Sequence, residues 1–133
     1  MEQIIYNTDV LVAGGGPAGV AAAVGAARQG KRVLLIEKNG YCGGMGTING
    51  AFCGYYTSAK SGPLTQLVHG FAGEFYDAMK ARGGVAEPYP FGDTYIVTND
   101  HLVWRETADA FLAEAGVQVL FHTVVTDVIV EEN

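Results

Sequence analysis

The sequence predicts an α/β fold built on a parallel sheet. Three short and nearly continuous apolar runs carry this prediction, at residues 8–13, 33–37 and 117–121, because strands buried on both faces of a parallel sheet have this pattern. The 133 residues correspond to about one domain, and 49% are hydrophobic against 17% charged, which excludes a disordered chain. Glycine is frequent, with 19 residues, and twelve of them fall between Gly14 and Gly54.

The first two strands enclose a helix. Residues 17–29 are rich in alanine and predict a helix that begins at Pro17 and stops at Gly30. Strand, helix and second strand fit within residues 8–37, which is the length of a βαβ unit with a right-handed crossover.

The next part of the chain predicts a loop and two helices. Residues 39–62 are rich in glycine without a clear period, and we expect a loop there. Residues 64–82 predict an amphipathic helix, and residues 101–115 a second one after a loop or short strand at 85–97. The apolar face expected on the first of these helices consists of Leu64, Leu67, Val68, Phe71, Phe75 and Met79.

The end of the chain predicts two more strands. Residues 117–121 supply the third strand of the parallel sheet, and residues 124–132 a fourth strand with partial alternation. An apolar strand at the end of a chain is an exposed edge unless another segment covers it. We therefore expect an incomplete domain that belongs to a larger fold.

Charge and composition exclude several classes of protein. The net charge is −6, with five basic and three acidic groups in residues 1–60 and three basic and eleven acidic groups in residues 61–133. No basic stripe is present, so nucleic acid is not an expected partner. Residues 10–27 are uncharged, but the glycines and proline at their centre break a continuous helix, so no membrane span is expected. No secretory signal is visible, which indicates a cytoplasmic protein.

The most specific motif is Gly14-Gly15-Gly16-Pro17-Ala18-Gly19, a G-x-G-x-x-G turn between a strand and a helix. In such turns Gly14 permits the tight bend, Gly16 lets a pyrophosphate approach the backbone, and Gly19 lets the helix pack on the strand. The helix N-terminus favours an anion, and Glu37, at the end of the second strand, can accept hydrogen bonds from ribose hydroxyls. The motif predicts dinucleotide binding but does not separate NAD from FAD.

The run from Asp9 to Glu37, followed by Cys42-Gly43-Gly44-Met45-Gly46-Thr47, resembles the start of flavoproteins of the glutathione-reductase-like FAD superfamily. It looks most like the bacterial FAD-dependent oxidoreductases related to the fumarate reductase and succinate dehydrogenase flavoproteins. The resemblance implies a Rossmann-like FAD-binding fold, of which residues 1–133 are the N-terminal part, with the substrate domain absent. It also implies that residues 124–132 are the first strand of a separate β-meander.

The resemblance also implies positions for the cofactor. Five residues would contact the FAD pyrophosphate: Gly14, Gly16, Pro17, Ala18 and Gly19. Glu37 would bind the adenosine ribose, Lys38 would lie beside the adenine, and the backbone of Val125 would meet the adenine edge. Four residues would line the flavin side: Gly43, Gly44, Met45 and Thr47.

Other residues predict no additional chemistry. The three histidines are far from the Gly-Gly pair in sequence, so we expect FAD to be bound non-covalently. Cys42 and Cys53 lack the spacing of a redox dithiol and are too few for a metal site. Phe52 is expected in the core, whereas Tyr55 and Tyr56 fit either the core or a wall of the flavin pocket.

Three functions remain open from the residues alone. The first is an FAD-dependent oxidoreductase acting on a small-molecule substrate or electron donor or acceptor, with catalytic residues beyond position 133. The second is an NAD-dependent dehydrogenase, and the third is a non-catalytic dinucleotide-binding module. We favour the first, because the Gly-Gly segment has no use in an NAD domain. We then expect the 133-residue chain alone to bind FAD poorly and to show no turnover.

Overall fold

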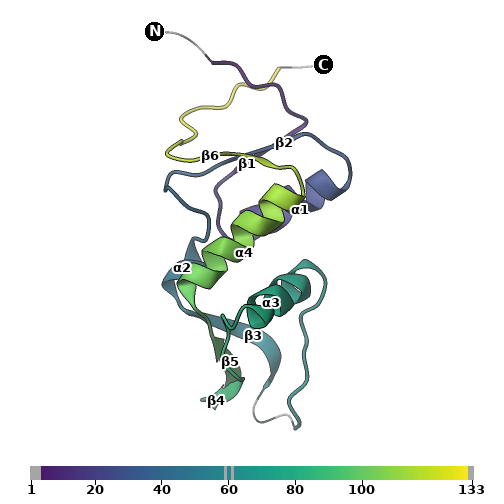
Figure 1. The fold of residues 1–133 in the computed structure, drawn as a ribbon, viewed down its shortest axis with the longest axis vertical. Coiled ribbons are helices and arrows are strands. Elements are labelled where there is room, and N and C mark those ends of the chain that lie inside the picture. Colours follow the sequence, from purple (N-terminus) through teal and green to yellow (C-terminus); the bar gives the residue numbers. More distant parts are fainter. Residues whose placement is uncertain (1–3, 59, 61, 132–133) are drawn as a thin grey trace.

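The computed structural model describes residues 4–58, 60 and 62–131, and its elements form two sheets connected by helices (Figure 1). The first sheet is parallel, with strand order β1-β2-β6. Its strands are β1 (Val10–Ala13), β2 (Val33–Ile36) and β6 (Gln118–Leu120). Val10 lies opposite Val33, so the first two predicted strands are adjacent and parallel, as expected.

Two helices cover one face of this sheet. Both α1 (Pro17–Arg28) and α4 (His101–Glu114) match the helices predicted from the sequence. The start of α4 is capped by Asp100, whose Oδ1 accepts hydrogen bonds from the backbone N–H groups of Leu102 and Val103 at 2.7 and 3.1 Å. The helices pack together over the sheet, and their buried side chains belong to one core with those of β2.

The burial of the three strands differs from the expectation. Only β2 is buried along its whole length, whereas in β1 the side chains alternate, and Leu11 is 53% exposed. The prediction that all three strands are buried on both faces is therefore wrong for β1 and β6. The reason is that these are the outer strands, and α1 and α4 pack on the same face of the sheet.

The second sheet lies at the other end of the molecule (Figure 1). It is antiparallel, with order β3-β5-β4, and consists of β3 (Ala51–Ser58), β5 (Thr94–Thr98) and β4 (Tyr89–Phe91). The loop predicted for residues 39–62 is thus wrong, because this segment contains β3 and a short helix, α2 (Met45–Ile48). The pairing of β3 with β5 joins residues far apart in sequence, and no local pattern indicates it.

The helix predicted for residues 64–82 starts later than expected. Helix α3 spans Phe71–Ala81 and begins after Gly70, whose φ of 67° is left-handed. Residues 65–67 instead form hydrogen bonds with β3, because Thr65 O accepts the N–H of Thr57 and the N–H of Leu67 is donated to Tyr55 O. Three residues expected on the buried face are accordingly exposed: Leu64, Leu67 and Val68.

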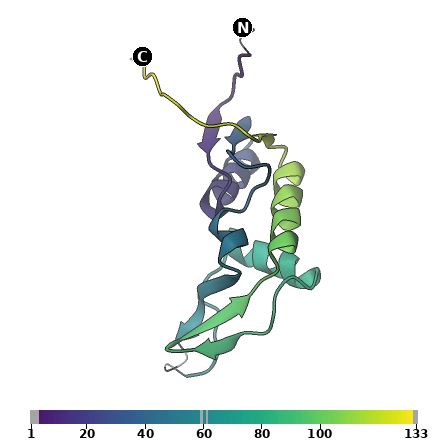
Figure 2. The same cartoon turned by 90° about the vertical axis from the view of Figure 1, so that its left-hand side faces the viewer.

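The strand predicted for residues 124–132 is not formed in its described part, residues 124–131. Beyond β6 the chain runs out as an extended segment at the same end of the molecule as the N-terminal residues (Figure 2). Five of its apolar side chains are exposed: Val124, Val125, Val128, Ile129 and Val130. A strand needs a hydrogen-bonded neighbour, and no other strand of the described chain lies beside this segment.

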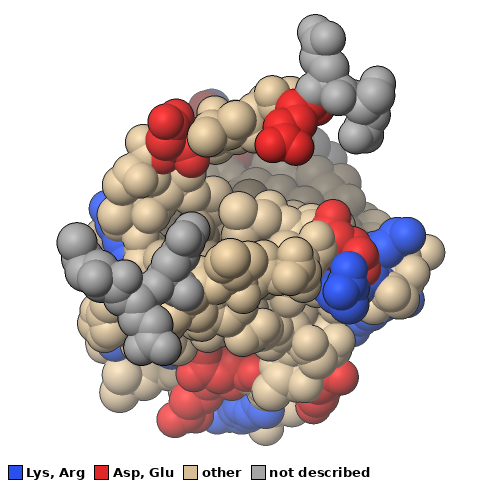
Figure 3. Space-filling model, turned by 90° about the horizontal axis from the view of Figure 1, so that it is seen from above, with Lys and Arg blue, Asp and Glu red and all other residues tan. Residues whose placement is uncertain are grey.

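The end of the molecule that carries both termini is largely uncharged (Figure 3). In this view basic side chains occur at separate places, and acidic groups lie toward the margin.

Among the described residues, no helix is long and apolar enough to cross a membrane, and no group of three or more potential metal ligands occurs.

Candidate functional site

The glycine turn connects β1 directly to α1. Gly14 has a φ of 106°, and its N–H donates to the carbonyl of Ile36 at 2.8 Å, which ties the turn to β2. Helix α1 starts with Pro17, has no side-chain cap and has no acidic residue in its first turn. The unpaired N–H groups and the positive end of the helix dipole are therefore not neutralised by the helix's own side chains, which is the geometry of an anion site.

Three glycines of the turn have different neighbours. A Cβ on Gly19 would overlap the carbonyl oxygen of Gly14, so the close approach of helix and turn requires glycine there. A Cβ on Gly15 would come within 2.6 Å of the sulfur of Cys42. At Gly16, by contrast, φ is −70° and nothing lies within 4 Å of an added Cβ. The described chain alone does not require glycine at position 16.

Glu37 is held against this turn. Its side chain is buried, and its Oε2 accepts the N–H of Gly15 at 2.7 Å. The other oxygen, Oε1, accepts both the backbone N–H and the side-chain Nδ2 of Asn39, each at 2.8 Å. Burial alone would raise the pKa of Glu37, but these hydrogen bonds and the charge of Lys38 outweigh it and hold the pKa below its ordinary value. An ionised carboxylate therefore lies beside the turn at neutral pH.

The segment after Glu37 is fastened to the turn through Cys42 and Gly43. The N–H of Gly43 donates to the carbonyl of Gly15 at 2.8 Å, and Cys42 is fully buried beneath Gly15. Burial, together with the charges of Asp109 and Glu37, raises the pKa of the Cys42 thiol to about 12. This thiol is protonated at neutral pH and packs within the core.

The Gly-Gly pair lies against the start of α1. Gly43 and Gly44 have φ values of 152° and 46°, and a Cβ on Gly44 would lie 3.1 Å from the Cα of Gly16. The hydroxyl of Thr47 donates to the carbonyl of Gly44 at 3.0 Å and closes the first turn of α2. Met45, at the start of α2, is 63% exposed.

A cavity of about 240 Å³ opens at the carboxyl ends of the parallel strands. It brings together Gly14, Glu37, Lys38 and Val125, four of the residues predicted to bind the cofactor. Its remaining lining residues are Ala13, Ile36, Thr123 and Val124. In open α/β sheets ligands bind in this position, outside the carboxyl ends of the strands.

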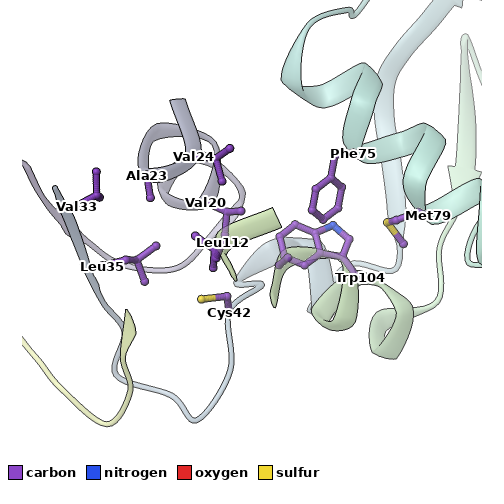
Figure 4. Packing of buried hydrophobic residues seen from close by; sticks show 11 residues of the cluster. Val20, Ala23, Val24, Val33, Leu35, Cys42, Phe75, Met79, Trp104 and Leu112 are labelled. Atoms are coloured by element: carbon purple, nitrogen blue, oxygen red, sulfur yellow. The ribbon is translucent and has the colours of Figure 1, made fainter. Parts of the chain in front are cut away.

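A second cavity, of about 330 Å³, borders the turn at Pro17 and α2 at Met45. Its walls are mostly apolar, with five aromatic residues: Phe52, Tyr55, Phe71, Phe75 and Trp104. The rings of Phe75 and Trp104 lie close together, with centroids 4.7 Å apart (Figure 4).

The sequence interpretation did not bring these aromatic residues together. Trp104 packs in the core, and its place beside α2 depends on the fold. Phe52 packs against the core as expected, and Tyr55 both belongs to the core and lines the second cavity. The two cavities lie at Gly14 and Pro17, the two ends of the turn.

Comparison with known proteins gives a family. A family model described as FAD dependent oxidoreductase matches residues 9–133. The thiamine thiazole synthase of Aeropyrum pernix is 33% identical over 127 residues, which cover 96% of this chain and 41% of that protein.

Solved structures show the same fold. The structure of THI4 from Thermovibrio ammonificans superposes with a TM-score of 0.58 at 23% identity, over 95% of this chain and 43% of that one. A geranylgeranyl bacteriochlorophyll reductase-like protein from Thermoplasma acidophilum gives a TM-score of 0.56 at 19% identity, over 93% of this chain and 32% of that one. The chain thus spans less than half the length of each of these proteins.

Proposed function

This chain belongs to the family of FAD dependent oxidoreductases, and from that premise we propose that it is the N-terminal, cofactor-binding part of such an enzyme. FAD, when bound, supplies the redox centre that exchanges electrons with a small-molecule substrate. The residues of this chain would bind and orient the cofactor, and a substrate domain would follow in the longer protein. We expect the enzyme to work in the cytoplasm.

The observation that carries this proposal is the open space at Gly16. Gly15 and Gly19 are explained by the packing of the chain itself, whereas Gly16 has an ordinary φ and no neighbour within 4 Å of an added Cβ. Glycine at this position is useful when a ligand, rather than the protein, occupies the space in front of it. A pyrophosphate on the N-terminus of α1 fits this requirement, because Ala18 and Gly19 present backbone N–H groups in the first helical turn.

The cavity at the strand ends fits the adenosine half of FAD. Glu37 would accept a ribose hydroxyl, and Lys38 and Val125 would flank the adenine. The residues present suit this half of the cofactor, since an ionised carboxylate and a mostly apolar wall lie in one cavity.

The other end of the turn fits the flavin half. Gly43 and Gly44 have positive φ values, and a Cβ on Gly44 would lie 3.1 Å from the Cα of Gly16, so this segment packs closely on the start of α1. Met45 and Thr47 follow, and the apolar cavity begins beside Met45. An apolar, aromatic wall suits the flat ring system of a flavin better than it suits the polar second ribose of a nicotinamide nucleotide. This arrangement favours FAD over NAD.

The proposed function is tested by flavin content. The longer protein that we propose is expected to be purified with FAD that denaturation releases without proteolysis, and to reduce a dye acceptor. The chain of residues 1–133, prepared in parallel, is expected to retain little FAD and to give no turnover, because the flavin would remain largely in water. Absence of flavin from the longer protein would contradict the proposal. Full FAD content with comparable turnover in the short chain would contradict the claim that residues 1–133 need a further domain for cofactor retention and activity.

Replacing Glu37 by alanine is expected to weaken both cofactor binding and the fold. The variant loses a charge-assisted acceptor for the ribose, worth about 1.5–3 kcal/mol, and leaves the buried N–H of Gly15 unpaired, which costs about 1–3 kcal/mol. Because the pKa of Glu37 is lowered by folding, its contribution to stability is present above the ordinary carboxyl pKa and is lost as pH falls through the folded-state value.

Thermal unfolding against pH and FAD fluorescence titration measure these effects. The isosteric variant Glu37→Gln is measured beside it: it keeps the shape but removes the titrating group and one acceptor oxygen, so its stability should no longer depend on pH through residue 37. An unchanged FAD affinity in Glu37→Ala would show that the carboxylate does not face the nucleotide.

A further inference from the structure

The carboxylate of Glu37 is already partly occupied by donors from the chain. An ionised carboxylate offers about four acceptor positions, two on each oxygen. Asn39 fills both positions on Oε1 with its backbone N–H and Nδ2, and Gly15 fills one on Oε2. A single acceptor position therefore remains, on Oε2.

We propose that Asn39 is a positioning residue for the cofactor, which holds Oε1 of Glu37 so that Oε2 alone receives the ribose. This inference rests on the proposed function, because it concerns the same nucleotide cavity. A glutamate side chain has several rotamers, and a ligand that must order it binds more weakly than one that finds it already fixed. Asn39 provides that order before the nucleotide arrives.

The position of Asn39 between the strand ends supports this role. Its carbonyl accepts the N–H of His122 at 3.3 Å, and the carbonyl of Glu37 accepts the N–H of Thr123 at 3.0 Å. His122 has a φ of 54°, which is uncommon for a residue other than glycine and turns the chain after β6. The residues that follow, Thr123 to Val125, line the same cavity as Glu37.

Asn39 thus connects the two walls of the adenosine cavity. Its side chain reaches the carboxylate at the end of β2, and its backbone holds the segment that follows β6. A substitution of the side chain removes the first connection and leaves the second, since the second uses only backbone atoms. The effect on binding can therefore be separated from the effect on the fold.

Three substitutions in the protein at its natural length test the inference. Asn39→Ala removes the side-chain donor, Asn39→Asp replaces it by an acceptor of the same shape, and Asn7→Ala removes an exposed asparagine with no described side-chain hydrogen bond. FAD affinity is measured by fluorescence titration, and the titration of the Glu37 carboxyl by NMR in the ligand-free protein.

We expect Asn39→Ala to weaken FAD binding about tenfold, as loss of a hydrogen bond to a charged group does. Asn39→Asp is expected to weaken it further, because two carboxylates then face each other, and Asn7→Ala to leave it unchanged. The pKa of Glu37 should rise in both Asn39 variants, and the melting temperature should fall only by the amount that this pKa shift implies, because the backbone hydrogen bonds of residue 39 remain.

Two outcomes would overturn the inference. One is an FAD affinity in Asn39→Ala equal to that of the unsubstituted protein. The other is an Asn39→Asp variant that binds FAD as well as the unsubstituted protein, which would indicate a role of shape alone. Both differ from failure of the proposed function, in which the unsubstituted protein itself binds no FAD. The pKa measurement in the ligand-free protein tests the hold of Asn39 on Glu37 independently of the cofactor.

Discussion

Replacing Gly19 by alanine is expected to disrupt the fold at its centre. The added methyl group would overlap the carbonyl oxygen of Gly14 and approach its carbonyl carbon to 3.0 Å, and both atoms belong to the backbone. Neither can move without separating α1 from the turn, so we expect a loss of about 3 kcal/mol or more. In a chain of 133 residues that loss corresponds to a fall in melting temperature of roughly 10 °C or more.

The control for this variant lies in the same helix. Gly25 is exposed near the middle of α1, and nothing lies within 4 Å of an added Cβ. Gly25→Ala is expected to stabilise the protein by about 0.5–1 kcal/mol, because alanine is the better helix former. Differential scanning calorimetry of the two variants measures both effects. A Gly19→Ala variant as stable as Gly25→Ala would contradict the close contact of α1 with the turn.

Replacing Gly16 by alanine is expected to weaken cofactor binding and to leave the fold intact. The added methyl group has no protein neighbour within 4 Å, and the φ of −70° suits alanine. It would project into the space that we assign to the pyrophosphate, and the resulting overlap should cost about 1–3 kcal/mol of binding, which is about 5- to 150-fold in affinity.

Gly16→Ala and Gly19→Ala therefore have opposite signatures. Gly16→Ala should have a melting temperature close to that of the unsubstituted protein and bind FAD weakly. Gly19→Ala should have a clearly lower melting temperature. Fluorescence titration with FAD, together with the melting temperature of each variant, gives the comparison. Unchanged FAD affinity in Gly16→Ala would mean that the space in front of Gly16 is not used by the cofactor.

The βαβ unit was predictable because its signals are local. The apolar run before Gly14, the alanine-rich helix that stops at Gly30, and the run ending at Glu37 are each contained in a few consecutive residues. The same holds for α4, whose start is specified by Asp100 and whose end is followed by Gly116 at a φ of 73°. In these elements, local propensity and the final packing agree.

The elements that were missed depend on partners far away in sequence. Strand β3 forms because β5 lies beside it, and the glycine in its sequence, Gly54, argues against a strand locally. The apolar spacing of Leu64, Leu67 and Val68 continues the period of α3, but the backbone of this segment pairs with the edge of β3 instead. Propensity was overridden by non-local pairing.

The candidate site was predictable in its parts and not in its connections. Residues 14 to 16 are all glycine, and only the structure shows that Gly15 faces Cys42 while Gly16 faces open space. The contribution of Asn39 could not be predicted for the same reason, because an asparagine two residues after a glutamate is not part of any specific motif. Its role follows from three hydrogen-bond distances.

The position of FAD in a crystal of the protein at its natural length tests the central claim most directly. The account predicts electron density for the pyrophosphate over Gly16 at the start of α1, with the adenosine in the cavity of Glu37, Lys38 and Val125. The flavin should then lie on the side of Gly43 to Thr47. Density for the nucleotide elsewhere on the chain, or with the flavin at Glu37, would contradict the account.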